Sequence, residues 1–400
     1  MRNASDDPQR IARRDHLDPY DLDDGGLGVR SVEVLVAGQD ESGGFLASPT
    51  FPVYRFAWLR DGSFCARALD MVGRGDRAAL FHRWVSRTVL AHREHAERAI
   101  ADLHAGRTPE PSDILPARYI VDGRREEPGA DASEDWPNYQ LDGYGTWLYE
   151  LATHVRLHGD AAATVDRTAV DLVARYLGAA WRTDCYDCWE EFGDGQHAAT
   201  IAAVAAGLAA AADLLDATVD GTATGRPDDA APHDAAAFRE TAAEIGASFR
   251  DRFVRDGVLR KDSRDDRVDG SLLWCALPFG LLDVADPVMR RTAEAIRADL
   301  RGGTGGLYRY RGDTYYGGGE WILLVAWLGW YDAATGNVDG WRAAIEWIRA
   351  AATAELDLPE QTTDGVQEPD MVEPWTNRWG PVATPLLWSH AMYLIMAATR

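Results

Sequence analysis

Lysine is almost absent from this chain, in which Lys261 is the single lysine among 41 basic residues. Acidic residues number 64, so the formal net charge is -23 at neutral pH. A surface with this balance repels phosphate groups, which argues against nucleic acid and anionic membranes as partners. The same charge destabilises a compact chain by self-repulsion unless salt screens it. We therefore expect an acidic, halophilic type of protein.

Cysteine is also scarce, with four residues in 400. This number is too small for a disulfide scaffold and fits a reducing compartment. Cys185 and Cys188 have C-x-x-C spacing, but no second pair follows, so a structural role is expected. His92 and His95 share a helical face without an evident third ligand. The sequence thus predicts neither a metal site nor a cofactor.

Two kinds of targeting segment are missing as well. No apolar run is long enough to suggest a membrane span, and the N-terminus lacks the apolar segment of a signal peptide. We expect a cytoplasmic protein without membrane partners, which is a monomer or a weak homo-oligomer.

The pattern of apolar residues predicts an all-α protein. Residues 1–25 are charged and rich in turn formers, so they are expected to form a flexible tail. Residues 26–400 have helical spacing and predict a single catalytic domain. Asp160, Pro232 and the pair Asp286-Pro287 are helix start signals. Twelve helices are predicted, near 26–38, 62–73, 76–105, 140–158, 161–182, 196–218, 233–254, 268–279, 286–300, 319–334, 339–354 and 383–399.

Alternating short and long connections between these helices favour six helical hairpins closed into a ring. The long stretch 108–138 and the Gly-rich stretches 302–306 and 317–319 would be loops over a pocket at one end. An open helical solenoid is the alternative, but its tandem repeats would be expected to resemble one another.

Aromatic and charged residues occur together in several predicted loops. Tyr54, Trp58 and Arg60 occupy alternate positions, so they share one face of an extended segment that ends at Asp61. Trp136 opens a second mixed segment, 136–143. Flat rings cover the C–H faces of a pyranose, while amides and carboxylates bind its hydroxyls. A sugar site is therefore predicted, although an architectural ion pair or a helix cap would use the same residue types.

Two glutamates are candidates for acid and base catalysis. Glu190 lies beside a tryptophan and another carboxyl group, both of which raise a pKa, so it is the predicted general acid. Glu360, between a proline and a glutamine in a loop, is the predicted base that deprotonates water. A solvated acidic patch is the alternative for the first segment. Trp388, on the last helix, suits a core position equally well.

Eight segments in collinear order resemble the glycoside hydrolases of family fifteen, the glucoamylase family. They are Ser42 to Phe45 with Ser48-Pro49, Tyr54 to Asp61, Trp136 to Gly143, Trp189-Glu190-Glu191, Asp269 to Leu273, Arg309-Tyr310, Pro359-Glu360-Gln361 and Ala383 to His390. The resemblance spans almost the whole chain after the tail. It implies an (α/α)6 barrel, Glu190 as general acid and Glu360 as general base. The predicted substrate contacts are Tyr54, Trp58, Arg60, Asp61, Trp136, Asp187, Trp189, Glu191, Arg309, Trp321 and Trp388.

The resemblance further implies an inverting, exo-acting hydrolase that releases β-glucose from the non-reducing end of a short α-linked glucose oligosaccharide. An inverting pair needs roughly 6.5 to 9.5 Å between its carboxyl groups, and a retaining pair about 5 to 5.5 Å. We expect no starch-binding module in this protein, which favours short soluble substrates. An isomaltose glucohydrolase or a trehalase of the same family is the alternative. An inverting disaccharide phosphorylase and a non-catalytic carbohydrate-binding protein are more distant possibilities.

Overall fold

The computed structural model describes residues 17–19, 22, 24–126, 136–159, 164–217 and 234–399. Most of the predicted tail, 1–25, lies outside these ranges, as do the predicted start signals Asp160 and Pro232. The end of that segment is held by Asp24, whose carboxylate accepts hydrogen bonds from the backbone of Gly28 and from the Tyr393 hydroxyl. The chain is therefore tied to its C-terminal helix just before the first helix begins.

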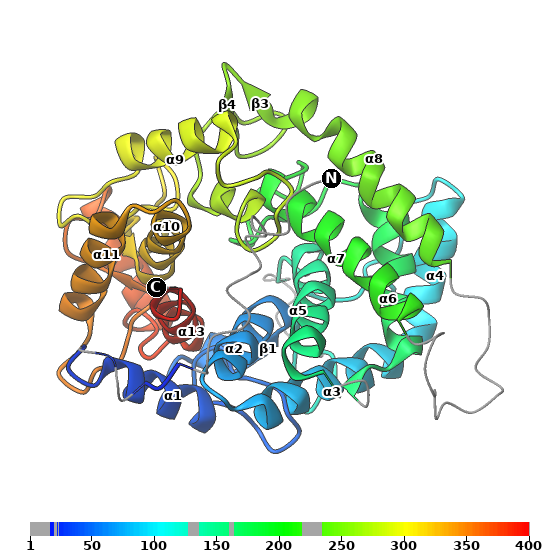
Figure 1. Cartoon of the computed structure of the whole chain (residues 1–400), viewed down its shortest axis with the longest axis horizontal. Helices are drawn as coiled ribbons and strands as arrows, with labels where there is room; N and C mark the ends of the chain where they lie inside the picture. Colours follow the sequence, from blue (N-terminus) through cyan, green and yellow to red (C-terminus); the bar gives the residue numbers. More distant parts are fainter. Residues whose placement is uncertain are drawn as a thin grey trace.

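An inner ring of helical segments forms the centre of the described structure. Each segment packs on the next, and the last packs back on the first, which closes the ring (Figure 1). Most side chains on these segments are buried, as expected for helices surrounded by other helices. The members are α2 (Leu59–Met71), α5 (Asp142–His158), α7 (Ala198–Asp216), the 3-10 segment η5 (Gly270–Cys275), α10 (Ile322–Ala334) and α13 (Leu387–Ala397).

An outer layer of amphipathic helices covers the ring (Figure 1). Helix α11 illustrates the pattern, because it buries Ala344 and Ile348 against the ring and leaves its other face exposed. The outer helices are α1 (Leu27–Ala37), α3 (Gly75–Ala91), α6 (Arg167–Ala180), α8 (Ala235–Phe253), α9 (Pro287–Asp299) and α11 (Val338–Ala351). The predicted (α/α)6 barrel is confirmed.

Several helix boundaries differ from the sequence prediction. The predicted helix 76–105 is two helices, α3 and α4 (Arg93–His104), because the chain bends at His92 and α4 turns to pack on α6. The predicted α-helix 268–279 is the short 3-10 segment η5, in which Asp269 caps the backbone of Ser271. Helix α12 (Val372–Trp379) was not predicted. Asp286 and Pro287 start α9 as predicted, with the Asp286 carboxylate accepting from the backbone of Val288.

Three antiparallel pairs of two-residue strands were also missed. They pair β1 (Ala57–Trp58) with β2 (Arg118–Tyr119), β3 (Val254–Arg255) with β4 (Val258–Leu259), and β5 (Glu320–Trp321) with β6 (Gln361–Thr362). Such short strands leave no periodic signal, since period-2 alternation needs at least four residues to be recognised. The β1–β2 and β5–β6 pairs join segments distant in sequence, whereas β3 and β4 form a local hairpin.

One helix of the described structure, α7, is long and apolar enough by length and composition to cross a membrane, which the sequence analysis did not anticipate. Of the 18-residue apolar stretch of this helix, 83% is buried inside the molecule. It packs against α5, α6, α8 and η5. The all-round apolar character of α7 is therefore that of a core helix of the inner ring.

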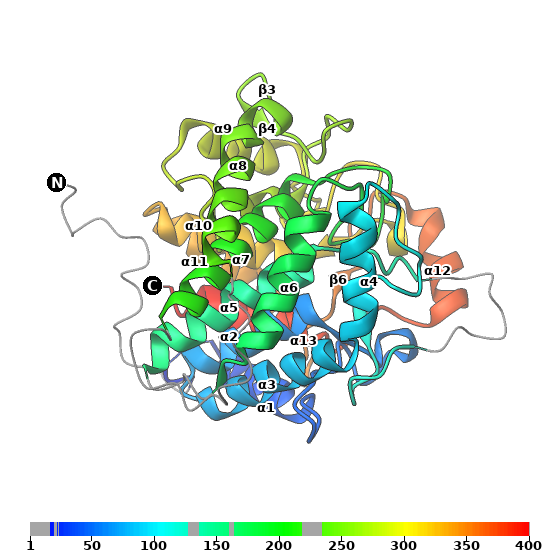
Figure 2. The same cartoon turned by 90° about the vertical axis from the view of Figure 1, so that its right-hand side faces the viewer.

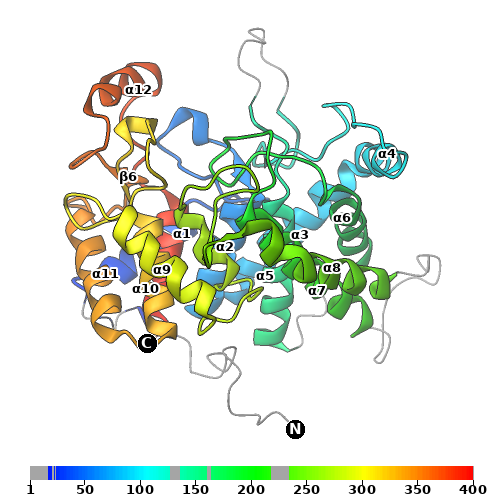
Figure 3. The same ribbon diagram turned by 90° about the horizontal axis from the view of Figure 1, so that it is seen from above.

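The long inner helices run in one direction. Helices α2, α5, α10 and α13 begin at Leu59, Asp142, Ile322 and Leu387, next to the segments that the sequence analysis singled out. Their amino ends carry partial positive charge from aligned peptide dipoles. Helix α12 and strand β6 lie at one end of the ring (Figure 2 and Figure 3).

Candidate active site

A cavity of about 580 Å³ opens at the amino ends of the inner helices. This size lies within the range typical of small-molecule sites. Of the thirteen predicted catalytic and substrate-contacting residues, Asp187 alone does not line it. The lining residues are Ala47, Val53, Tyr54, Trp58, Arg60, Asp61, Arg118, Glu126, Trp136, Pro137, Cys188, Trp189, Glu190, Glu191, Arg309, Tyr315, Trp321, Glu360, Trp375, Arg378, Trp379, Leu386 and Trp388.

Glu190 lies in the wall of this cavity on a strained loop. Its φ angle is 69°, in the left-handed region that non-glycine residues seldom adopt. Its Oε1 accepts hydrogen bonds from the indole of Trp58 at 2.5 Å and from the amide of Gln140 at 3.2 Å. Arg60 approaches the same oxygen at 3.9 Å. One carboxylate oxygen is thus fixed by donors, in a backbone conformation of the kind that concentrates at functional sites.

Asp187 holds this loop from behind. Its Oδ1 accepts hydrogen bonds from the backbone of Trp189 and of Glu191, both at 2.9 Å. Its Oδ2 accepts from the buried ammonium of Lys261 at 2.7 Å. Both oxygens are therefore occupied within the protein, and Asp187 supports the loop rather than facing the cavity.

Lys261 joins two carboxylates behind the cavity. Its ammonium also donates to Asp269 at 2.6 Å, and Asp269 accepts from the indole of Trp189 at 3.0 Å. Burial acts to raise the pKa of Asp269, but the charge of Lys261 and the hydrogen bonds of Ser271 overcome it and hold that pKa below its usual value. The single lysine of the chain thus anchors the backbone and the indole that flank Glu190.

Glu360 faces the cavity from the loop before β6. Its Oε1 accepts a hydrogen bond from the Tyr54 hydroxyl at 2.9 Å, and Tyr54 also bonds the Tyr315 hydroxyl at 2.8 Å. Its buried Oε2 has no hydrogen-bond partner among the described residues. Burial raises the pKa of Glu360 to about 8, while the Tyr54 hydrogen bond and the charge of Arg309 act in the opposite direction. One oxygen is therefore positioned and the other is available to a ligand.

Arg60 and Asp61 begin α2 at the bottom of the cavity, and both are buried. Arg60 donates to Gln140 at 2.8 Å and to Asp142 at 3.2 Å, and it lies 3.2 Å from the Asp61 carboxylate. Burial raises the pKa of Asp61 to about 6, against the opposing charge of Arg60. The arginine is held by its neighbours, so it presents fixed donors to whatever enters.

Glu191 and Arg309 form a second charged pair in the wall, with an Nη2 to Oε1 distance of 3.2 Å. Arg309 is in turn held by two 2.7 Å hydrogen bonds to the carboxylate of Asp313, in a bidentate arrangement. The Tyr310 hydroxyl donates to the other oxygen of Glu191. Burial raises the pKa of Glu191, and Arg309 opposes this effect.

Aromatic rings supply much of the remaining surface. Trp58 and Trp136 lie edge to face at 5.9 Å, and the guanidinium of Arg118 stacks 3.6 Å from the centre of Trp136. Trp375 and Trp379 of α12 pack against Tyr315. Buried indole nitrogens of Trp136, Trp321, Trp375 and Trp388 have no hydrogen-bond partner among the described residues. Rings combined with unsatisfied donors suit a ligand that has both C–H faces and hydroxyls.

The sequence analysis did not assign Arg118, Tyr315 or Lys261 to the site. Arg118 belongs to β2, whose pairing with β1 brings it beside Trp58. Tyr315 comes from a segment without a recognisable motif. For Lys261 a signal was present, because a single lysine in an acidic chain is unusual. Finding its role required knowledge of what surrounds it.

Cys188 lines the cavity, whereas His92 and His95 lie outside its lining. All four cysteines are reduced and buried. His92 bonds the carbonyl of Gly123 and His95 lies beside Asp113. No pocket carboxylate belongs to a set of three potential metal ligands within the described ranges.

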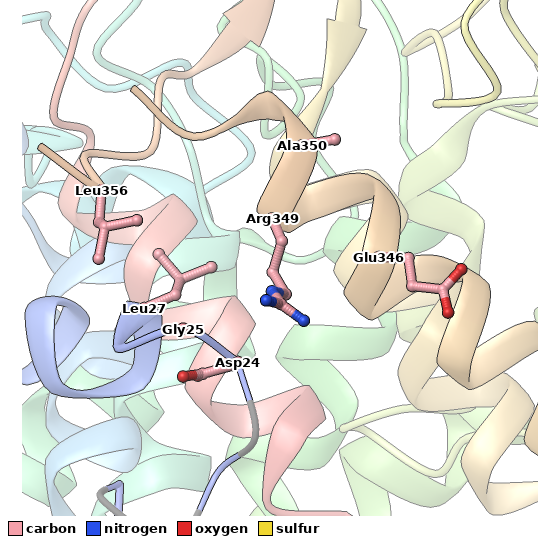
Figure 4. Close-up of a pocket in the computed structure, with 7 residues that line it drawn as sticks. All are labelled: Asp24, Gly25, Leu27, Glu346, Arg349, Ala350 and Leu356. Carbon is pink, nitrogen blue, oxygen red and sulfur yellow. The ribbon is translucent and has the colours of Figure 1, made fainter. Parts of the chain in front are cut away.

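A second cavity lies away from this site, between the start of α1 and helix α11 (Figure 4). The Arg349 side chain extends from α11 into the space and approaches Gly25 (Figure 4). The Asp24 carboxylate there is already engaged by backbone amides and by Tyr393. This cavity therefore holds no arrangement of acid and base groups comparable to Glu190 and Glu360.

Comparison with known proteins agrees with the geometry. Residues 29–362 match the model of the glycosyl hydrolases of family 15. The isomaltose glucohydrolase of Kribbella flavida is 39% identical over 372 residues, which cover 93% of this chain and 91% of that protein. A wild-type glycosidase structure is 37% identical with a TM-score of 0.83, covering 94% of this chain and 98% of the other. A bacterial glucoamylase bound to acarbose, at 20% identity and a TM-score of 0.69, covers 93% of this chain and 55% of its own and shares the fold. The chain belongs to glycosyl hydrolase family 15 and is a glycoside hydrolase.

Proposed function

We propose that this enzyme is an inverting, exo-acting α-glucoside hydrolase that releases β-glucose from short α-linked gluco-oligosaccharides. The observation that carries the proposal is the placement of Glu190 and Glu360 on the wall of one cavity, each with an oxygen fixed by an aromatic donor. In this scheme Glu190 donates a proton to the glycosidic oxygen as the bond to the anomeric carbon breaks. A water molecule attacks that carbon, and Glu360 accepts its proton through Oε2.

The surrounding residues support the binding of a terminal glucose. Arg60 and Asp61 offer buried donors and acceptors to hydroxyls at the bottom of the cavity, while Trp58 and Trp136 cover a sugar face. The amino ends of the inner helices favour negative charge at this end of the barrel. Such a cavity, closed below by the packed ring, admits a chain end rather than an internal segment.

Among α-linked disaccharides we favour isomaltose as substrate. This preference rests on the isomaltose glucohydrolase of Kribbella flavida, which aligns with nine-tenths of both chains. A structure similar over 94% of this chain is that of a glycosidase variant in complex with glucose, which supports glucose recognition here. Maltose and trehalose remain the competing substrates, since family membership does not specify the linkage.

The test compares isomaltose, maltose and trehalose with the purified enzyme, with the anomeric form of released glucose followed by NMR. We expect β-glucose first from isomaltose, at a rate that added phosphate does not change. A phosphate requirement would instead identify a phosphorylase, and failure to release glucose from any of these sugars would favour a binding protein. Initial release of α-glucose would refute inversion.

The catalytic assignment has its own test. General acid or base assistance contributes about 10² to 10⁴ in rate, so Glu190→Gln and Glu360→Gln should each lower kcat by about that factor while the fold is retained. Glu368→Gln, on the described loop before α12 and outside the cavity lining, is the matched control. Near-full activity of both pocket variants would show that the two roles belong elsewhere.

A further inference from the structure

A second cluster of reactive side chains lies away from the cavity. Asp70 of α2, His82 of α3 and His154 of α5 place one donor atom each within 4.8 Å of the others. The Nδ1 atom of His154 is 2.9 and 3.0 Å from the two carboxylate oxygens of Asp70. The His82 and His154 rings are 5.1 Å apart, and all three residues are buried.

His82 is the unusual member of this cluster. Its side chain is 0% exposed, and neither ring nitrogen has a hydrogen-bond partner among the described residues. Buried polar groups in native proteins nearly always have a partner, so an imidazole without one calls for an explanation. A bound cation at the centre of the cluster supplies such a partner.

The cluster is separate from the catalytic machinery. Helix α2 begins beside Arg60 at the cavity and carries Asp70 in its last turn, about 15 Å further along the axis. Helix α5 likewise runs from Asp142, next to Arg60, to His154 in its last two turns. The three residues therefore sit at the end of the ring opposite to the cavity.

We propose that Asp70, His82 and His154 bind one divalent transition-metal ion of the Zn²⁺ class and so join the ends of α2, α3 and α5. Two imidazoles and one carboxylate are a donor set that suits zinc, with ligand bonds of about 2.0 to 2.2 Å. Donors in a tetrahedron of that size lie about 3.3 Å apart. The pair formed by Asp70 and His154 already approaches this spacing, so His82 makes the main adjustment.

His158 lies beside the cluster and supports one of the proposed ligands. It lies one turn after His154, the spacing at which two histidines share a helix face. Its Nε2 is 2.7 Å from Asp70 Oδ1, so it orients the carboxylate. Its ring is 4.8 Å from that of His154 and is partly exposed, which gives an ion a path from solvent. Because His158 is engaged in this way, the fourth coordination position falls to a water molecule.

Co²⁺ is the probe for a first test, because tetrahedral Co²⁺ gives visible absorption bands. The wild-type enzyme, stripped with a chelator and dialysed, is titrated with Co²⁺ and then with Zn²⁺. We expect one equivalent of Co²⁺ per chain and its displacement by Zn²⁺. His82→Phe and Asp70→Asn should lose this stoichiometric binding. The double variant His92→Gln/His95→Gln, which removes two partly buried histidines outside the cluster, is the matched control and should keep it.

Thermal unfolding provides an independent readout. A hundredfold excess of Zn²⁺ over its Kd should raise the Tm of the wild type by about 3 °C and leave the Tm of His82→Phe unchanged. If His82→Phe does not fold, Asp70→Asn and the wild-type titration still decide the question. A wild type that neither binds Co²⁺ stoichiometrically nor shifts its Tm overturns the site, as does undiminished binding by both variants.

Discussion

The buried ammonium of Lys261 offers the sharpest test of how the catalytic loop is held. Lys261→Met keeps the length of the side chain but leaves the carboxylates of Asp187 and Asp269 without their shared cation. Removing one partner of a buried ion pair costs about 3 to 5 kcal/mol, because the remaining charge is left in a medium that solvates it poorly. We therefore expect a clear decrease of the urea midpoint at neutral pH.

The pH dependence of this loss distinguishes charge from packing. In the wild type the pKa of Asp269 is held below its usual value, so its stabilising contribution is present above the unfolded pKa and is lost as pH falls through the folded one. Without Lys261, burial dominates and raises that pKa. The difference in stability between variant and wild type should therefore be largest at neutral pH and shrink as the pH falls toward 4.

The assay is urea unfolding from pH 4 to pH 8, combined with kcat on the preferred disaccharide. A displacement of the loop by about 1 Å would lower kcat by about a hundredfold. Arg239 is the matched control, because it also joins two aspartates, Asp213 and Asp216, but on the surface. Arg239→Met should leave midpoint and kcat unchanged. If Lys261→Met did the same, the network would not hold the loop.

Three further predictions concern charge. Tyr54→Phe removes a donor that lowers the pKa of Glu360, so the acidic limb of the kcat/KM profile should move to higher pH, whereas an unmoved limb would separate Tyr54 from the base. Burial raises the pKa of Glu360 from 4.5 to about 8, so its stabilising contribution is full below the unfolded value and is lost as pH rises through the folded one. Glu360→Gln should consequently be more stable than the wild type above pH 8, by a few kcal/mol, and equal to it near pH 4 in urea unfolding. Finally, a net charge of -23 predicts that the Tm rises from low to molar KCl, and a steady fall in a melting series would contradict adaptation to salt.

The arrangement of the inner helices explains why the site residues could be proposed from the sequence. Arg60 and Trp388 belong to segments that end loops and begin inner helices, and a closed ring brings such segments together whatever the intervening chain does. The pairing of Glu190 with Glu360, by contrast, rested on the resemblance to the glycoside hydrolases of family fifteen, because neither residue begins an inner helix and either could be a solvated loop carboxylate. The ring itself followed from helical periodicity and from the alternation of connection lengths.

Other features depended on contacts that no local pattern encodes. Asp187 was expected to touch substrate because it adjoins Glu190, but Lys261, from a segment 74 residues away, draws its carboxylate behind the loop. Arg118 reaches the cavity through a strand pair of only two residues. Glu190 adopts a left-handed backbone conformation, which sets the direction of its side chain. Non-glycine residues seldom adopt this conformation, so the local sequence does not predict it. Such outcomes are fixed by tertiary packing.

The buried polar residues at the two ends of the inner helices differ in their effect on stability. At their amino ends, Asp61 and Glu360 are buried carboxyl groups with raised pKa values, a state that stores destabilisation for use in binding and catalysis. At the far ends of α2 and α5, Asp70 and His154 form a compact pair that packing alone does not complete, because His82 beside them lacks a partner. A cation there would stabilise the barrel about 15 Å along α2 from Arg60, where added rigidity does not restrict the loop that carries Glu190. Stability and catalysis can then be adjusted separately within one ring of helices.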